Sequence, residues 1–140
     1  MQHYKHRTQI QLRFKDGDLM GHVNNANHFT YFELARVTYF KEVVGDVVNW
    51  KNEGIILARM VIDYKAPLLI TDSTFASTRC TRLGDKSFDL EHLLIVNNNG
   101  DEKIIATGTC TLVCYNYING ISISIPDEWR GKMQVYDRIN

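Results

Sequence analysis

Apolar and polar residues alternate over several stretches of the chain, and a two-residue period is typical of strands. The first stretch covers residues 8–14, where Ile10, Leu12 and Phe14 share one face. Four more stretches follow in the second half of the chain, at residues 56–64, 73–83, 86–97 and 103–117. Turn-forming sequences at residues 84–85 and 97–101 are typical of hairpin connections. The pattern therefore predicts an antiparallel meander after the first strand.

The segment between the first two strands has the period of a helix instead. Asn24 or Asn25 can cap this helix, which runs to about Val44 and meets a stop signal at Gly45. Because its apolar side chains point to most sides, we expect the helix to be enclosed on several sides. A sheet that curls about such a helix gives an α+β fold. A second, short helix can start at Pro126.

Length and composition fit a single folded domain. The chain has 140 residues, and we treat residues 1–140 as one unit. Sixteen basic and sixteen acidic side chains cancel, which disfavours nucleic acid and anionic membranes as partners. The first residues lack the apolar core of a signal peptide, and no apolar run can span a bilayer, so we expect a cytoplasmic protein. Three cysteines without a CxxC pair favour buried, reduced thiols.

The stretch that could carry chemistry is residues 16–28, between the first strand and the helix. It holds two carboxylates, two imidazoles and three amides. Such groups at a helix N-terminus lie near unpaired N–H groups and a dipole that favours negative charge, so a developing oxyanion would be stabilised there. The composition alone equally fits a turn, in which Asp16 and Asp18 are turn formers and the asparagines cap the helix.

The order of residues in this stretch resembles a known signature. The string DxDxxGHVNNA from Asp16, continued by YFExAR from Tyr31, is similar to that of hotdog-fold acyl-CoA thioesterases of the 4-hydroxybenzoyl-CoA thioesterase type. Further similarities occur at residues 63–68, 83–88 and 125–126, so the resemblance covers nearly the whole chain. It implies a hotdog fold, in which an antiparallel sheet of about five strands wraps around one long central helix.

The resemblance also implies an activity and its residues. The expected reaction is hydrolysis of an acyl-CoA or acyl-carrier-protein thioester to a carboxylic acid and the free thiol, without a metal or other cofactor. The catalytic carboxylate of the family falls on Asp18, which acts either as a nucleophile that forms an anhydride or as a general base that activates water. The backbone N–H of Asn25 is the expected oxyanion donor, and losing such a donor typically costs about 3 to 4 kcal/mol.

His22 has an open role. Related plant acyl-carrier-protein thioesterases use an Asp, an Asn and a His in a similar string, but Met20 stands where the Asn would be. His22 can therefore take part in catalysis, orient water, bind substrate or hydrogen-bond the loop.

Three residues of the turn before the fourth strand, Arg82, Lys86 and Ser87, are candidates to bind the phosphates of coenzyme A. The alternative is that they are ordinary solvated turn residues. We expect the acyl chain to lie in a groove shaped by residues such as Phe32, Tyr39 and Met60.

Other polar residues have structural interpretations. Glu33 and Arg36 are spaced to form an ion pair on the helix, and His92 is expected to be a hydrogen-bonded core histidine. The remaining histidines show no metal-ligand spacing.

The resemblance further implies a homodimer or homotetramer with its active site at the subunit boundary. Two other functions stay open: a hydratase or dehydratase that uses Asp18 and His22, and a non-catalytic acyl-binding domain, because a fold does not by itself establish an activity.

Overall fold

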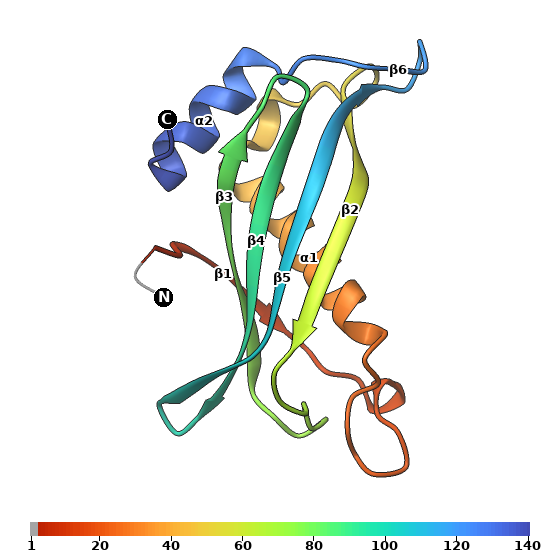
Figure 1. Cartoon of the computed structure of the whole chain (residues 1–140), viewed down its shortest axis with the longest axis vertical. Helices are drawn as coiled ribbons and strands as arrows, with labels where there is room; N and C mark the ends of the chain where they lie inside the picture. The colour runs from red at the N-terminus through yellow and green to blue at the C-terminus, as the bar shows by residue number, and fades with distance from the viewer. Residues whose placement is uncertain (1–2) are drawn as a thin grey trace.

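The structure is a computed structural model that describes residues 3–140 of the chain. Within these residues, one sheet and two α-helices make up the fold (Figure 1). The strands are β1 (His6–Ile10), β2 (Gly54–Tyr64), β3 (Thr74–Leu83), β4 (Ser87–Asn98), β5 (Asp101–Asn116) and β6 (Ile121–Ser122). The helices are α1 (Asn27–Val43) and α2 (Asp127–Asp137), with short 3-10 helices η1 (Phe14–Asp16) and η2 (Gly45–Val47). The architecture is α+β, as the sequence predicts.

The six strands of the described chain form one antiparallel sheet in the order β1-β3-β4-β5-β2, and β6 pairs with the end of β5. The predicted hairpins β3–β4 and β4–β5 are confirmed. The predicted meander is wrong for β2, which pairs with β5 at an edge of the sheet and not with β3. Residues 65–73 carry the chain from β2 past the end of the sheet to β3. Alternation specifies that a segment is a strand, but it does not specify its neighbours.

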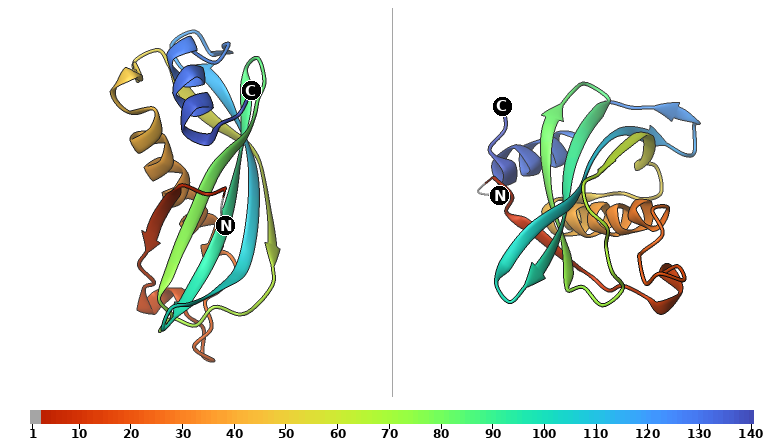
Figure 2. Two further views of the ribbon diagram at one scale, coloured as in Figure 1. Left: turned by 90° about the vertical axis from the view of Figure 1, so that its left-hand side faces the viewer. Right: turned by 60° about the horizontal axis from the view of Figure 1, so that its bottom comes forward.

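Helix α1 packs across one face of the curved sheet (Figures 1 and 2). Phe32 is fully buried against β5, where a Cβ added at Gly108 would lie 3.0 Å from Phe32 Cε2. The absence of a side chain at Gly108 therefore lets the helix approach the sheet closely. On the opposite side of the helix, Phe29, Leu34 and Val37 are 48%, 46% and 59% exposed. The expectation that α1 is enclosed on several sides is wrong for a single chain, because the sheet covers one side only.

The ends of α1 differ partly from the prediction. The helix starts at Asn27, and its N-cap position is Ala26, whose backbone angles are already helical. No side chain caps the helix, so the predicted capping by Asn24 or Asn25 is wrong. Asn24 instead accepts a hydrogen bond from the N–H of Ala26 at 2.9 Å, closing a turn just before the helix. The predicted stop at Gly45 is confirmed by its φ of +69°, a conformation that favours glycine.

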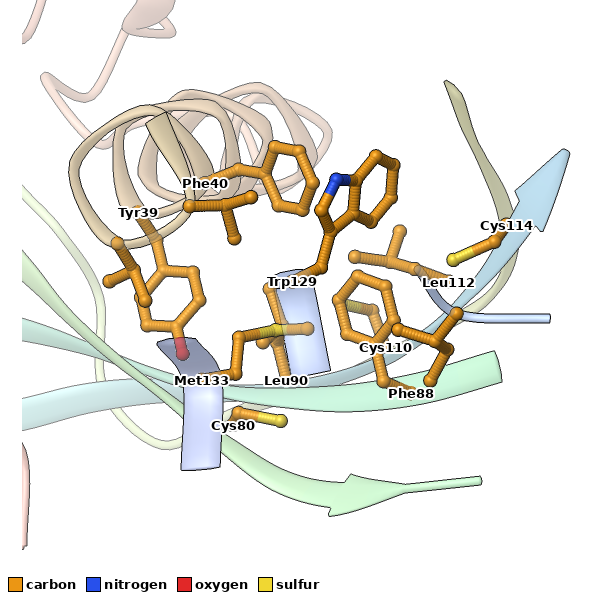
Figure 3. Close-up of a cluster of buried hydrophobic side chains, with 13 residues drawn as sticks. Tyr39, Phe40, Cys80, Phe88, Leu90, Cys110, Leu112, Cys114, Trp129 and Met133 are labelled. Carbon is orange, nitrogen blue, oxygen red and sulfur yellow. The ribbon is translucent and has the colours of Figure 1, made fainter. Parts of the chain in front are cut away.

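Helix α2 closes one end of the core. Its residues Trp129 and Met133 are fully buried between α1 and the sheet (Figure 3). All three cysteines are free thiols in this part of the structure and are buried, as predicted. His92 is also a core residue, with Nδ1 2.9 Å from the hydroxyl of Thr78. These groups are explained by packing.

Two β-bulges change which residues face the core. A bulge between Leu57 and Arg59 reverses the alternation of β2, so Ile56 faces outward, 38% exposed, although the sequence predicts it inside. The register between β4 and β5 shifts between Leu94 and Ile95. As a result Ile105 of β5 is buried, although the sequence predicts Ile104 on the core face. Strand β1 also ends earlier than predicted. Phe14 therefore lies in η1 with its side chain 90% exposed, and its predicted place on a buried face is wrong.

Candidate active site

The segment between η1 and α1 folds into a tight turn centred on Asp18. The N–H of Asp18 donates to the carbonyl of His22 at 2.8 Å, and the N–H of Gly21 donates to the carbonyl of Asp18 at 3.1 Å. Gly21 has a φ of +77°, which a residue with a side chain rarely adopts. Asp18 Oδ1 accepts the N–H groups of Met20 at 2.8 Å and His22 at 3.1 Å. The turn thus fixes one carboxylate oxygen of an exposed side chain.

The other carboxylate of the motif, Asp16, anchors this segment to the protein. Its side chain is 1% exposed and accepts hydrogen bonds from the Tyr31 hydroxyl at 2.7 Å and from Arg13 Nε at 3.1 Å. Burial alone would raise the pKa of Asp16, but the bonds from Tyr31 and Arg13 outweigh it and hold that pKa below its ordinary value. Its carbonyl accepts the N–H of Asn24 at 2.9 Å. Asp16 is therefore a buried structural carboxylate, whereas Asp18 is an exposed carboxylate that a substrate can reach.

Asn25 occupies the last turn before α1. Its carbonyl accepts the Tyr64 hydroxyl at 2.7 Å and the N–H of His28 at 3.3 Å. No group of residues 3–140 accepts a hydrogen bond from the N–H of Asn25. We call this arrangement, formed by Asn24, Asn25 and Ala26, the Asn25 turn. The structure thus brings Asp18, His22 and Asn25 together on one segment, with Tyr64 of β2 fixing the peptide that follows Asn25.

His22 is partly buried and lines a hollow of about 340 Å³ together with Leu69, Asp72 and Lys103. The backbones of His22 and Leu69 form an isolated antiparallel bridge. This bridge connects the Asp18 turn to the loop that follows β2. No hydrogen bond joins the His22 imidazole to another group of the described chain. A direct role for this ring remains a prediction.

The candidate phosphate-binding residues lie elsewhere. Arg82 and Ser87 are brought together, with Arg82 Nη2 2.9 Å from Ser87 Oγ and Arg82 Nε 2.8 Å from Asp89 Oδ2. Lys86 is exposed and forms no ion pair with residues 3–140. Arg82 lies near the end of β3, Lys86 in the β3–β4 turn and Ser87 at the start of β4, at the end of the molecule opposite the Asp18 turn (Figure 1). Within one chain, they do not meet Asp18.

A groove of about 640 Å³ lies between the second half of α1 and the start of β2. Its apolar wall consists of Val37, Phe40, Trp50, Ile55, Leu57 and Leu112. Glu33 and Arg36 stand at its polar side, with Arg36 Nη2 4.0 Å from Glu33 Oε2, so the predicted ion pair is present but loose. We call this hollow the α1–β2 groove.

Sequence reasoning missed the residues of the α1–β2 groove. Phe32 and Tyr39, which it assigned to the acyl groove, are fully buried in the core. Only the exposed face of α1, which carries Val37, could have indicated this groove. The residues from β2 could not be found, because their place beside α1 depends on the strand order.

Residues 3–140 contain no group of three or more His, Cys, Asp or Glu side chains arranged to hold a metal ion. No helix there is long and apolar enough to cross a membrane.

Comparisons with known proteins identify the family of the chain. The family model described as the thioesterase-like superfamily matches residues 12–133. The chain is 24% identical over 131 residues to the long-chain acyl-CoA thioesterase FadM of Escherichia coli, covering 91% of this chain and 96% of that protein. It superposes with a TM-score of 0.83 and 32% identity on a Thermus thermophilus thioesterase complexed with coenzyme A and Zn, over 100% of this chain and 99% of the other.

A third structure, the BH1999 gentisyl-coenzyme A thioesterase, superposes with a TM-score of 0.79 and 28% identity, over 91% of this chain and 99% of that one. The family match spans the Asp18 turn and strands β2 to β6 of the sheet. The chain belongs to the thioesterase-like superfamily and is a thioester hydrolase.

Proposed function

We propose that the protein hydrolyses an acyl-CoA thioester to a carboxylic acid and free coenzyme A, with Asp18 as the reacting carboxylate and the Asn25 N–H as the oxyanion donor. The observation that carries the proposal is that one short segment, residues 17–26 between η1 and α1, fixes both groups. Two backbone N–H groups hold Asp18 Oδ1, while Oδ2 accepts no hydrogen bond from the described chain. The N–H of Asn25 is free to donate, at the positive end of α1.

The chemistry needs little else. A thiolate is a good leaving group, so a positioned carboxylate and a donor for the carbonyl oxygen are sufficient for acyl transfer. In one route Asp18 Oδ2 attacks the carbonyl carbon and forms an anhydride, which water then hydrolyses to release the acid and restore the Asp18 carboxylate. In the other route Asp18 takes a proton from a water that attacks the carbonyl carbon directly. In both routes the carbon–sulfur bond breaks with its electron pair on sulfur, the sulfur takes up a proton, and one water is consumed. The structure supports either route equally.

The α1–β2 groove is the proposed site of the acyl chain. It begins at Glu33, six residues or about 9 Å along α1 from its start at Asn27. The same helix thus leads from the Asn25 turn to an apolar wall. Each methylene that leaves water for this wall contributes about 0.8 kcal/mol, so the groove favours a long aliphatic chain. The activity in the name of the FadM relative, on long-chain acyl-CoA, agrees with this.

We propose a homodimer, or a dimer of dimers, as the working form. Strand β2 is an edge of the sheet over its 11 residues, and a long unpaired edge is a ready site for a second copy. Val37 of α1 lines the α1–β2 groove beside this strand, and Phe29 is a second exposed apolar residue of the same helix. Pairing there would cover the groove and bring a partner to the exposed Asp18 side chain. It is also the arrangement that would let the partner's β3–β4 turn, with Arg82, Lys86 and Ser87, contribute to binding coenzyme A.

The test is release of thiol from a panel of saturated acyl-CoAs, with Asp18→Ala beside the wild type. The proposal expects free thiol and acid from the wild type, and acyl-CoA binding without turnover from the variant. A hydratase would release no thiol from a saturated chain. A non-catalytic acyl-binding domain would bind without turnover in both forms, and either result would overturn the proposal.

A further inference from the structure

His28 is a buried side chain whose polar atoms the fold leaves without partners. It is the second residue of α1 and is 1% exposed. No hydrogen bond of acceptable geometry joins Nδ1 or Nε2 to a group of residues 3–140, although the carbonyls of Asn24 and Asn25 lie near the ring. Buried polar groups are nearly always bonded, so an imidazole in this state needs an explanation. A phenyl ring would fill the same place without the unpaired nitrogens.

The neighbours of His28 connect it to the Asn25 turn. Its ring packs edge-on against the ring of Tyr64, with centroids 4.8 Å apart, and lies 6.0 Å from that of Tyr31. Tyr64 donates its hydroxyl to the carbonyl of Asn25 at 2.7 Å, and the backbone N–H of His28 donates to the same carbonyl at 3.3 Å. The Asn25 carbonyl is therefore held by Tyr64, whose ring packs against His28, and by the backbone of His28 itself.

The surroundings of His28 favour its neutral form. The titratable groups packed against it are the phenols of Tyr31 from α1 and Tyr64 from β2. The nearest carboxylate in this network, Asp16 of η1, is already bonded to the Tyr31 hydroxyl and to Arg13. Burial lowers the pKa of His28 below its ordinary value, against the weaker effect of the carbonyls of Asn24 and Asn25. A proton on this ring would be a buried charge without a counter-charge.

We propose that His28 is a positioning residue for the hydrolysis: its neutral ring holds Tyr64 against the Asn25 carbonyl, and its protonation releases the Asn25 turn. The inference rests on the proposed function for its kinetic part, because it assigns the oxyanion donor to Asn25. Beyond the proposed function, the inference states that His28, which does not touch the substrate, makes the position of the Asn25 turn sensitive to acid. The effect falls on kcat more than on KM, because an oxyanion donor acts on the transition state.

Two variants separate packing from titration. His28→Phe keeps a ring against Tyr64 but cannot take up a proton. We expect its kcat at pH 8 to stay within threefold of the wild type and its melting temperature to rise by several degrees, because the unpaired nitrogens are gone. His28→Ala removes the ring, and we expect kcat to fall at least tenfold at pH 8 with KM changed less than threefold.

The decisive kinetic readout is the ratio of kcat between the wild type and His28→Phe as the pH falls. This ratio cancels every titration that the two forms share. We expect it to be constant at high pH and to fall at least fivefold below about pH 6.5, the ordinary pKa of histidine. The control is His3→Gln, which changes an exposed histidine outside the site and leaves the ratio of wild type to variant constant. A constant ratio for His28→Phe, with both enzymes stable over the range, would overturn the proposal.

A second readout does not depend on activity. In amide NMR spectra, the N–H of Asn25 is expected to shift with the same midpoint as the His28 ring, and to lose that transition in His28→Phe. If the Asn25 amide follows His28 but no thioester is hydrolysed, the positioning inference stands and the proposed function fails. If hydrolysis is normal and the Asn25 amide ignores the His28 titration, the inference is wrong and the proposed function survives.

Discussion

The two aspartates of the DxD motif should have separable effects, and Asp16 offers the clearest stability prediction. Asp16→Ala removes the acceptor of the Tyr31 hydroxyl and of Arg13, and it leaves that hydroxyl buried and unpaired. Arg13 is half-exposed and regains water, so the cost is that of the lost bonds to the carboxylate and of the unpaired Tyr31 hydroxyl, about 2 to 3 kcal/mol. At about 3 °C per kcal/mol for a domain of this size, the melting temperature should fall by about 6 to 9 °C. Urea unfolding and circular dichroism measure both quantities.

Asp18→Ala is the matched control for this experiment. Its carboxylate is exposed and loses only two bonds to backbone N–H groups, so the expected cost is about 1 kcal/mol. If Asp16→Ala unfolds within 1 kcal/mol of the wild type, or no earlier than Asp18→Ala, then Asp16 is not the anchor described above.

The same reasoning gives a pH dependence with a definite sign. The folded state holds the pKa of Asp16 below its value in the unfolded chain, so the ionised form stabilises the fold. This contribution is complete well above the unfolded pKa of about 3.9 and is lost as the pH falls through the folded pKa. The difference in unfolding free energy between wild type and Asp16→Asn should therefore shrink below about pH 4. A difference that stays constant to pH 3 would refute the assignment of the pKa shift.

Three further predictions concern the substrate and the assembly. Val37→Trp fills the α1–β2 groove and should lower kcat/KM for long-chain acyl-CoAs at least tenfold while sparing short chains, whereas Val135→Trp, an exposed position of α2 outside the groove lining, should spare both. Equal losses for all chain lengths would contradict the groove assignment. Lys86→Ala should raise KM about threefold to tenfold for acyl-CoA but not for a thioester of N-acetylcysteamine, which has no phosphate. An unchanged KM would remove Lys86 from the binding site. Light scattering at micromolar concentration should give at least twice the 16.2 kDa of one chain, and a monomer mass would refute the dimer.

The local parts of this fold were predictable because the responsible residues are close in sequence. The alternation of Phe88, Leu90 and His92 predicts the buried face of β4, and the structure buries all three. The Asp18 turn was equally accessible, since Asp18, His22 and Asn25 lie within eight residues and belong to one motif. In both cases the chain itself brings the groups together, so no tertiary information is needed.

The parts that failed depend on contacts between distant segments. Bulges at Ala58 and Ile105 shift the alternation by one residue, and their positions are set by the pairing of β2 and β4 with β5. The order of the strands decides that Tyr64 reaches the carbonyl of Asn25, 39 residues earlier in the chain. The exposed face of α1 was misread for a related reason. Its apolar residues predict burial, but one chain supplies only the sheet on one side, and the proposed second copy would supply the rest.

The most direct test of the account is a single-turnover measurement of thiol release from a long-chain acyl-CoA by the wild type and by Asp18→Asn. The substitution keeps the size of the side chain and an oxygen for the turn, so the fold and coenzyme A binding should be unchanged. The account predicts that the rate of the chemical step falls at least 1,000-fold, as expected when the reacting group itself is removed. Release within tenfold of the wild-type rate, with substrate bound equally well, would contradict the assignment of Asp18 as the reacting carboxylate.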